Sequence, residues 1–446
     1  MQKNGGSNVD YKASLEYLAR AERVTVNGAQ TLSKRADAFT RGAFPTAIAS
    51  GRGCRVQTVD GREMIDFICG LGALLLGHSH PLVEEAVIRQ LRAGHLVSLP
   101  HVLEAEVSEK FCAAVGQDMV RWVSTGSEAC TGAMRIARAA TGREMIITSD
   151  QSYHGWHDVF AASRPVRPGI PEAMSRLITT FKYNDLDDLR DVLDKHRENV
   201  ACVIMEPCFH ETPHQDFLSG IRELTLERGI VFIVDEMIMG LRMAFGGGSA
   251  YYNVKPDIVT FGKSIGGGLP LGCIVGKREY MKHGWFVSGT FSGNPLSLAA
   301  CNSVLDIYKS EKICETMWAL GYRFQHGFND IAYILGMSEI VQCDGFAVKP
   351  RVRFTCPQPE LVRPSEAWID TNQLAMSLFL QETALRGVLW HPAGGNISAA
   401  MTPEDIDQAL VAMGEALVIV NKAVDGGDWS VLEGRPIQPV SMVRKG

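Results

Sequence analysis

The sequence of 446 residues has no apolar stretch that approaches the ~18–20 residues of a membrane-spanning helix. Its eleven cysteines are scattered and include no C-x-x-C pair, and residues 1–20 do not resemble a secretion signal. These absences predict a protein of the reducing cytoplasm. The sequence also lacks a large excess of charge of either sign, with 44 Lys and Arg against 50 Asp and Glu. The net charge of −6 gives no reason to expect a nucleic acid or an anionic membrane as a partner.

Internal repeats and low-complexity tracts are also absent from the sequence. Hydrophobic residues make up 46% and charged residues 21%, as in an ordinary globular protein. Because 446 residues are many for a single hydrophobic core, one large and one smaller domain are expected. We place part of the smaller domain at residues 1–75, the large domain at 76–330, the rest of the smaller domain at 331–425, and an extension of no inferred role at 426–446.

From about residue 104, short apolar strands alternate with helical segments. This alternation predicts an α/β fold with a mostly parallel sheet and helices on both of its faces. Ligands of such sheets bind at the carboxyl ends of the strands. The predicted strands are 122–123, 145–148, 201–205, 230–234, 258–261 and 273–275, and two of the predicted helices are 127–140 and 217–227.

A lysine and an aspartate each follow one of these strands. Lys263 stands between the strand 258–261 and the glycines 266–268, and Asp235 ends the apolar run that begins at Ile230. A lysine amine can form a Schiff base with an aldehyde. A carboxylate can keep a pyridine nitrogen protonated, so that the ring draws electrons from a substrate carbon. The pair therefore predicts a site for pyridoxal 5′-phosphate (PLP), with Lys263 and Asp235 as catalytic residues.

The segment 124–129 follows a strand and opens a helix. Free backbone N–H groups and the helix dipole make such a place favourable for an anion. Gly126 would allow a close backbone approach, and Ser127 could add a hydroxyl donor. An ordinary capping box, in which Ser or Thr precedes Glu, is the alternative interpretation. Beside Lys263 and Asp235, we favour phosphate binding.

Three further side chains stand in predicted loops. Tyr153 could stack on a flat cofactor, although a lone aromatic residue in a loop is more often simple packing. His154 could orient a neighbour or be a satisfied polar residue, and we favour a structural role. Thr290 lies in the glycine-rich turn 289–295, where its hydroxyl could donate to a phosphate oxygen. A plain helix start is the alternative there.

Seven motifs follow one another along the chain. They are Gly77 to Pro81, Ser124 to Ala129, Tyr153 to Gly155, Glu206-Pro207, Asp235-Glu236, Gly262-Lys263 with the glycine triplet, and Gly289 to Pro295. Their order and spacing resemble the class III aminotransferases of PLP fold type I. The resemblance is greatest to the branch that contains glutamate-1-semialdehyde aminomutase, and it covers about residues 44–420. It implies a mostly parallel large domain with a smaller α+β domain built from both terminal segments.

The resemblance also implies roles for matching residues. Lys263 would hold the cofactor and shuttle a proton, and Asp235 would pair with the ring nitrogen. Thr290 would reach the phosphate bound by a neighbouring subunit, which implies a homodimer with shared active sites. The other cofactor contacts would be Gly126, Ser127, Tyr153, His154, Glu206 and Met237.

The chain departs from the family's pattern at positions that concern the substrate. Met237 stands where the family has a valine behind the ring, which a soft side chain can replace. The segment 390–396 lacks the arginine with which many relatives hold an α-carboxylate. The segment 32–39 resembles the gating segment of the aminomutase only loosely. The candidate substrate-binding residues are Arg35, Arg242 and His391.

The leading functional prediction is a transaminase. It would move an amino group from an amino-acid donor, glutamate being the first choice, to an aldehyde or ketone acceptor of sugar or secondary-metabolite origin. Intramolecular exchange, as in the 2,1-aminomutase, is the alternative and requires a gating segment that retains the intermediate. A PLP-binding protein without catalysis is a third possibility, against which the presence of both Lys263 and Asp235 argues. No metal is predicted, and the expected partners are small molecules and a second copy of the chain.

Overall fold

The computed structural model describes residues 10–208, 211–355 and 372–438. The chain divides into two compact units. We name residues 72–75 and 80–316 the central unit, and residues 1–71, 76–79 and 317–446 the terminal unit. No helix within the described ranges is long and apolar enough to cross a membrane.

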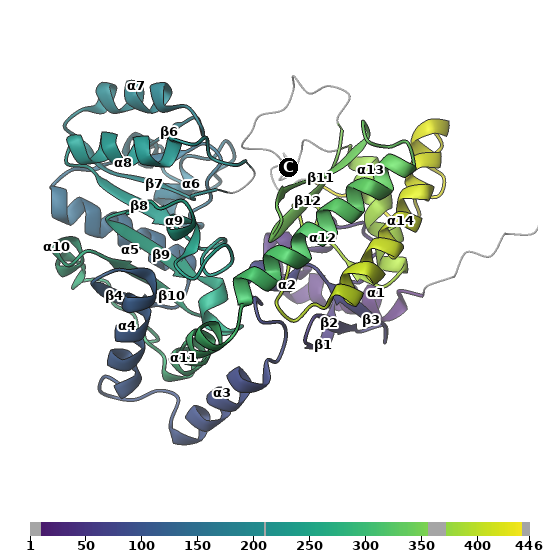
Figure 1. Cartoon of the computed structure of the whole chain (residues 1–446), viewed down its shortest axis with the longest axis horizontal. Helices are drawn as coiled ribbons and strands as arrows, with labels where there is room; N and C mark the ends of the chain where they lie inside the picture. The colour runs from purple at the N-terminus through teal and green to yellow at the C-terminus, as the bar shows by residue number, and fades with distance from the viewer. Residues whose placement is uncertain (1–9, 209–210, 356–371, 439–446) are drawn as a thin grey trace, which may run out of the picture. The chain divides into compact units, whose positions relative to one another are not determined.

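The central unit contains a seven-stranded sheet in the order β4-β10-β9-β8-β7-β5-β6 (Figure 1). Among these strands β10 runs against its neighbours β4 and β9, and the others are parallel to one another. The bounds are β4 (Met119–Val123), β5 (Met145–Ser149), β6 (Ile178–Phe181), β7 (Val200–Met205), β8 (Val231–Asp235), β9 (Ile258–Gly262) and β10 (Gly272–Gly276).

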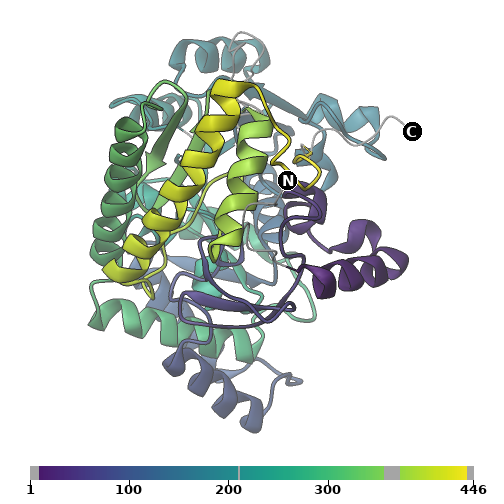
Figure 2. The same ribbon diagram turned by 90° about the vertical axis from the view of Figure 1, so that its right-hand side faces the viewer.

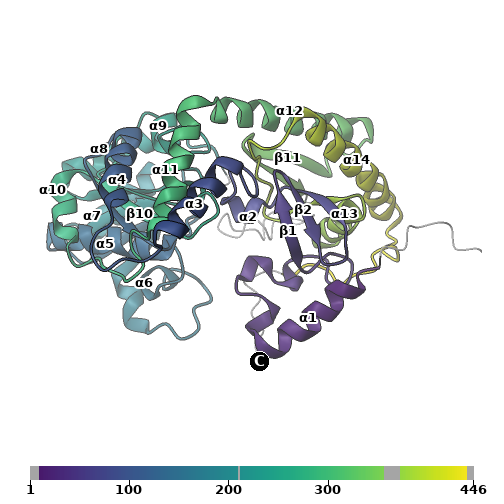
Figure 3. The same cartoon turned by 90° about the horizontal axis from the view of Figure 1, so that it is seen from below.

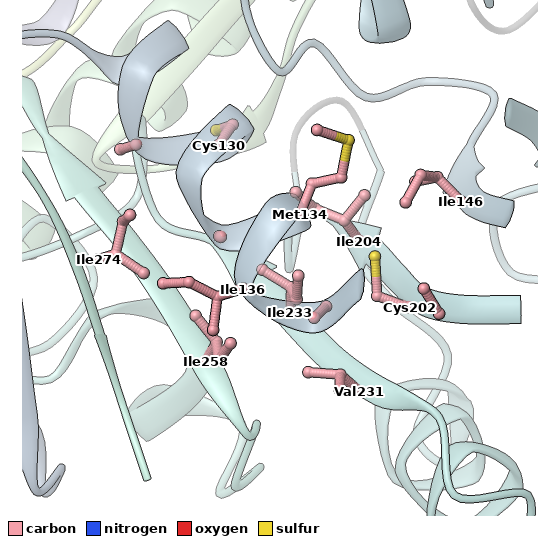
Figure 4. Close-up of a cluster of buried hydrophobic side chains, with 14 of the residues drawn as sticks. Cys130, Met134, Ile136, Ile146, Cys202, Ile204, Val231, Ile233, Ile258 and Ile274 are labelled. Atoms are coloured by element: carbon pink, nitrogen blue, oxygen red, sulfur yellow. The ribbon is translucent and has the colours of Figure 1, made fainter. Parts of the chain in front are cut away.

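Both faces of this sheet are buried, because successive side chains of a strand point to opposite sides. On β8, Ile233 packs under α5 (Gly126–Thr141), whereas Phe232 packs under α7 (Leu186–His196) and α8 (Phe217–Glu227). Figure 4 shows the first of these clusters, in which side chains of α5 face the strands. With both faces covered, the carboxyl ends of the strands are the natural place for polar groups.

A second group of helices lies on the β4 side of the central unit. There α11 (Pro295–Ser310) packs against α3 (Pro81–Ala93) and α4 (Val102–Val115), as Figure 3 shows. Phe111 of α4 contacts the rings of Trp122 and Phe261 on β4 and β9, which fixes this layer to the sheet. The shorter helices are α6 (Asp158–Ala161), α9 (Gly247–Tyr251) and α10 (Arg278–Met281).

The terminal unit is built from both ends of the chain. Its four-stranded sheet has the order β1-β2-β3-β13, and β11 pairs with β12 in a separate hairpin. Helices α13 and α14 lie side by side (Figure 2). The bounds are β1 (Ile48–Arg52), β2 (Arg55–Thr58), β3 (Glu63–Asp66), β11 (Val341–Phe346), β12 (Lys349–Phe354), β13 (Val388–Leu389), α1 (Lys12–Val24), α2 (Cys69–Gly72), α12 (Ile313–Ile334), α13 (Gln373–Leu385) and α14 (Pro403–Gly426).

All six strands predicted for the sheet are present, each within two residues of the predicted bounds except β4, which begins three residues earlier. The predicted helix 217–227 is α8. Strand β6 was not predicted from the sequence. It lies at the sheet edge and pairs with β5 alone, and its two central residues are the polar Thr179 and Thr180. An edge strand has less need of an apolar run, so no such signal marks it.

Candidate active site

The candidate site lies at the carboxyl ends of β7, β8 and β9. Asp235 is the last residue of β8 and is 1% exposed. Four donors surround its carboxylate. Its Oδ1 accepts from the Met237 backbone N–H at 3.0 Å and from Thr260 Oγ1 at 3.2 Å. Its Oδ2 accepts from His154 Nδ1 at 2.7 Å and from Cys130 Sγ at 3.1 Å.

These contacts keep Asp235 ionised. Burial alone would raise the pKa of Asp235, but the hydrogen bond and charge of His154, with the other donors, outweigh it and hold the pKa below its ordinary value. His154 is held in turn, because its Nε2 lies 3.0 Å from Thr148 Oγ1. The His154 ring therefore orients the buried carboxylate of Asp235, which is a structural role.

Glu206 follows β7 directly and is 4% exposed. Its Oε1 accepts from the Tyr153 backbone N–H at 3.0 Å, while its Oε2 has no hydrogen-bond partner among the described residues. Burial and the nearby charge of Asp235 raise the pKa of Glu206 to about 7, against the opposing effect of His154. A buried carboxyl oxygen without a partner indicates room for a polar group that the protein itself does not supply.

Lys263 follows β9 and adopts the left-handed backbone region with a φ of 45°. That conformation is unfavourable for residues other than glycine, and the surrounding turn stabilises it here. Ser264 Oγ, for example, donates to the Gly240 carbonyl at 2.7 Å. The loss of solvent lowers the pKa of the Lys263 amine, although the charges of Glu206 and Asp235 oppose that shift. The amine is thus biased toward its neutral form.

The predicted phosphate site is the start of α5. Thr125 caps this helix, and its hydroxyl accepts from the Glu128 N–H at 3.2 Å. The Glu128 carboxylate accepts from the backbone N–H groups of Ser124 and Thr125, each at 2.9 Å. The capping box that was the alternative is therefore present. It leaves the N–H groups of Gly126 and Ser127 at the first turn without an acceptor from the cap, so the capping box is compatible with phosphate binding, which stays a prediction.

Gly155 brings the 153–156 loop against the start of α5. Its φ is +97°, and a Cβ at this position would lie 2.2 Å from Ser127 Oγ. The Trp156 N–H donates to the same hydroxyl at 3.3 Å. The loop and the helix start therefore form one close-packed feature in which Ser127 is held by its neighbours.

Met237 fills the space between the helix start and the strand that leads to Lys263. Its Sδ would lie 2.8 Å from a Cβ at Gly126 and 2.6 Å from a Cβ at Gly262. The side chain is buried. A flexible thioether suits a gap of this shape. A side chain at position 126 would therefore displace the Met237 thioether, a contact that the sequence does not reveal.

Two predicted cofactor contacts lie at exposed positions. Tyr153 is 56% exposed, and the Arg164 guanidinium lies 5.4 Å from the centre of its ring. Thr290 lies in the exposed turn that precedes α11. Their predicted roles toward the cofactor and the neighbouring subunit stay predictions.

The three substrate candidates belong to different units. Arg242 belongs to the central unit, is fully buried, and donates from Nη2 to the Gly72 carbonyl at 3.1 Å. Arg35 and His391 belong to the terminal unit. Burial lowers the pKa of His391 to about 4. Its Nδ1 accepts from the Ala393 N–H and its Nε2 donates to the Ser33 carbonyl, so the ring is neutral and does not offer a positive charge to a carboxylate.

Cys130, His154 and Asp235 also have the spacing of a metal site, since their ligand atoms lie within 4.8 Å of one another. The sequence predicts no metal. The hydrogen bonds from the thiol and the imidazole to the Asp235 carboxylate account for this spacing without an ion.

Sequence reasoning missed Cys130, Thr148 and Thr260, which complete the surroundings of Asp235 and His154. A signal for Thr260 exists, because it is a polar residue in the otherwise apolar strand 258–261. Thr148 ends the apolar run 145–147 in the same way. Cys130 carries no such signal, since a buried cysteine in a helix is ordinary core.

We expect Gly155→Ala to weaken the affinity for PLP about tenfold or more, which corresponds to ~1.4 kcal/mol. The added methyl group would displace Ser127 from the predicted phosphate site. Gly169→Ala is the matched control, because φ at Gly169 is +75° but a Cβ there meets nothing within 4 Å. Fluorescence titration of the two apoenzymes with PLP measures the effect. Equal affinities for PLP in both variants would show that Ser127 does not contribute to phosphate binding.

Comparison with known proteins identifies the family of the chain. The family model for class III aminotransferases matches residues 38–343. The chain belongs to the class III aminotransferase family. Enzymes of this family are PLP-dependent, so PLP is the cofactor, and the α/β architecture is that of PLP fold type I, as the resemblance implied.

Relatives of this class III aminotransferase include both kinds of predicted enzyme. Glutamate-1-semialdehyde 2,1-aminomutase of Syntrophomonas wolfei is 33% identical over 432 residues, which are 91% of this chain and 97% of that protein. The enzyme of the same name from Methanococcoides burtonii is 38% identical over 307 residues, 65% of this chain and 73% of that protein. Among solved structures, an omega-transaminase from Sphaerobacter thermophilus is 26% identical with a TM-score of 0.82, covering 92% of this chain and 98% of the other.

The residues present fit PLP. The carboxylate of Asp235 is held ionised for a protonated ring nitrogen. The N–H groups of Gly126 and Ser127 at the start of α5 have no acceptor from the cap. The buried Glu206, whose Oε2 has no hydrogen-bond partner among the described residues, lies near the charge of Asp235. Packing and hydrogen bonds within the central unit hold each of these groups in position. The residues of this chain that fit the ring nitrogen and the phosphate thus belong to the central unit.

Proposed function

We propose that this enzyme catalyses the intramolecular exchange of an amino group on an amino aldehyde, of the 2,1-aminomutase type. The observation that carries the proposal is the similarity to proteins named glutamate-1-semialdehyde 2,1-aminomutase along 91% of the chain. This reverses the order of the two predictions made from the sequence. Intermolecular transamination becomes the second candidate, supported by the likeness to the omega-transaminase at 26% identity.

The central unit supplies the groups for the proton transfers of either reaction. When bound, PLP withdraws electrons from the substrate carbon that carries the amino group. We assign to the Lys263 amine the role of proton shuttle between that substrate carbon and the cofactor. Its lowered pKa favours the neutral amine that a base requires.

Asp235 and Glu206 would assist in different ways. Asp235, ionised and held by four donors, would keep the ring nitrogen of the cofactor protonated. Glu206, with a pKa near 7, would hold or release a proton beside the amine of Lys263 as the charge of the site changes. The residues that we propose as further PLP contacts would act by orientation alone. They are Gly126, Ser127, Tyr153, His154 and Met237.

Stoichiometry separates the two candidate reactions. The purified holoenzyme is incubated with glutamate-1-semialdehyde as the sole substrate, and 5-aminolevulinate is measured. The proposal predicts conversion at roughly 1 per second or faster, without an amino donor or an acceptor. Lys263→Ala serves as the control for uncatalysed rearrangement.

The contrary outcome is equally clear. No product from the single substrate, together with turnover that requires both an amino donor and a carbonyl acceptor, would reject the aminomutase and establish the transaminase. A glutamate donor is then the first to test, with aldehydes and ketones that lack a carboxylate beside the carbonyl as acceptors, because the segment 390–396 has no arginine.

We further propose a homodimer in which Thr290 of one chain contacts the phosphate held by the other. The exposed turn before α11, with Phe291 60% exposed, is the supporting feature. In a mixture of Thr290→Ala and Lys263→Ala chains, a shared site leaves one site of each mixed dimer without a lesion, so activity appears. Sites confined to one chain would give no such recovery. The cytoplasmic location stays a prediction.

A further inference from the structure

The Cys130 thiol lies beside the carboxylate of Asp235, which we propose as the partner of the ring nitrogen. Cys130 Sγ donates to Asp235 Oδ2 at 3.1 Å, and the cysteine is 1% exposed. Figure 4 shows Cys130 on α5, where it stands four residues after Gly126 and thus about 6 Å along the helix axis from it. The same helix therefore carries the predicted phosphate site at its start and a donor to the Asp235 carboxylate one turn later.

The thiol is protonated in this position. Loss of solvent and then the charge of Asp235 raise the pKa of the Cys130 thiol well above its ordinary value. A thiolate beside an ionised carboxylate would place two negative charges in a buried site. Cys130 is therefore a hydrogen-bond donor and not a nucleophile.

The Asp235 carboxylate already has as many donors as it has acceptor sites. A carboxylate offers about four lone-pair sites, two on each oxygen. Oδ1 accepts from the Met237 N–H and from Thr260 Oγ1. Oδ2 accepts from His154 Nδ1 and from Cys130 Sγ. The N–H of a protonated ring is a fifth donor, so it competes with one of these four for the carboxylate.

Of the four donors, the thiol forms the weakest hydrogen bond, because S–H is a weak donor. The Met237 N–H belongs to the backbone and cannot turn away by itself. The His154 bond is short, at 2.7 Å, and the ring is also fixed at Nε2 by Thr148 Oγ1 at 3.0 Å. The thiol has a second partner within reach, since Cys130 Sγ lies 3.6 Å from Thr260 Oγ1. The thiol is therefore the donor that leaves the carboxylate with the smallest loss of free energy.

We propose that Cys130 is a positioning residue whose thiol holds Asp235 Oδ2 and is displaced by the ring N–H when PLP binds. The displaced thiol turns to Thr260 Oγ1, and the carboxylate again has four donors. Only hydrogen bonds are exchanged, and no covalent bond changes. A weak donor keeps the buried carboxylate satisfied without competing strongly with the cofactor. The proposal rests on the proposed role of Asp235 and applies equally to an aminomutase and to a transaminase.

Infrared spectroscopy of the S–H stretching band tests the displacement directly. The frequency of this band rises when the hydrogen bond that the thiol donates becomes weaker. Because an ionised acceptor is replaced by a hydroxyl, we expect the Cys130 band to move to higher frequency when the full-length apoenzyme is titrated with PLP. Cys130→Ala identifies the band by its loss. Cys202→Ala identifies a control band that should not move, since Cys202 lies in the same buried cluster but has no described hydrogen bond to Asp235.

The affinity for PLP of two variants separates displacement from a purely structural role. A serine hydroxyl is a stronger donor than a thiol, so Cys130→Ser should resist displacement and weaken PLP binding about tenfold. Cys130→Ala has no donor to displace and should bind PLP at least as tightly as the wild-type enzyme. A structural role predicts the reverse order, because serine keeps a donor to Asp235 and alanine leaves a cavity. Fluorescence titration measures both affinities, and Cys202→Ala gives the effect of a buried cavity alone.

An unmoved Cys130 band on PLP binding would overturn the proposal, as would tighter binding of PLP by Cys130→Ser than by Cys130→Ala. The infrared result comes from the wild-type enzyme and does not depend on whether the serine variant folds. The role of Asp235 is tested separately by the ¹⁵N shift of the ring nitrogen in labelled PLP. A ring shift that differs in Asp235→Asn, with an unmoved Cys130 band, would reject only the displacement. An identical ring shift in that variant would reject the role of Asp235 and the displacement with it.

Discussion

Lys263→Ala is expected to abolish measurable turnover while the enzyme still binds PLP. The lysine stands in a strained turn at the end of β9, where solvent is largely excluded, and its amine is biased toward the neutral form. Loss of one positioned base costs typically 10²–10⁴-fold in rate, and the lysine would also be lost as the covalent attachment point. The predicted phosphate site at the start of α5 does not include this side chain, so cofactor binding should persist.

The experiment compares Lys263→Ala with Lys282→Ala, an exposed lysine of the same unit. Only the first should lose activity. Borohydride reduction of the wild-type holoenzyme followed by peptide mapping should place the pyridoxyl group on Lys263. A small alkylamine added to Lys263→Ala should restore part of the rate, since it replaces the missing base. A label on a different lysine would refute the assignment.

The central unit and its site were largely predictable because its determinants are local in sequence. A residue that directly follows an apolar run in an alternating pattern lies at a strand end, and parallel strands bring such ends together. Asp235 and Lys263 were singled out in this way, whereas Glu206 was implied by the resemblance. The charges of the three residues influence one another in the folded chain.

The tertiary contacts that surround these residues could not be predicted from the sequence. Cys130 contacts Asp235 only because α5 lies over β8, so that contact depends on how the two elements pack. The close approach of the Met237 sulfur to Gly126 likewise depends on packing. Such contacts depend on tertiary packing and produce no periodic pattern in the sequence.

In the terminal unit, contacts between residues far apart in the sequence were even less predictable. Arg35 and Gln438 are hydrogen-bonded although 403 positions separate them in sequence. No turn, cap or repeat marks the residues 427–438 as the partners of residues 35–41. A segment of low periodicity and with two prolines was therefore interpreted as an extension without a role.

Asp235→Asn is expected to slow the amino-transfer half-reaction by roughly 10²–10³-fold, the scale of loss when one preorganised electrostatic partner is removed. A neutral amide cannot keep a pyridine nitrogen protonated as a buried carboxylate does. The fold should persist. The amide oxygen can still accept from the Met237 N–H and Thr260, and the amide nitrogen can donate to His154 Nδ1 if the imidazole changes tautomer and its Nε2–H turns to Thr148 Oγ1.

Stopped-flow absorbance of the bound cofactor measures the half-reaction, and histidine ¹⁵N shifts report the tautomer of His154. Glu236→Gln is the matched control. This neighbouring buried carboxylate accepts only from the start of α9, with Gly248 N–H at 2.9 Å and Ser249 N–H at 2.6 Å among its described donors. That variant should lose stability but keep the rate of the half-reaction, because its carboxylate serves the helix. A wild-type rate in Asp235→Asn would mean that the ring nitrogen has a different partner.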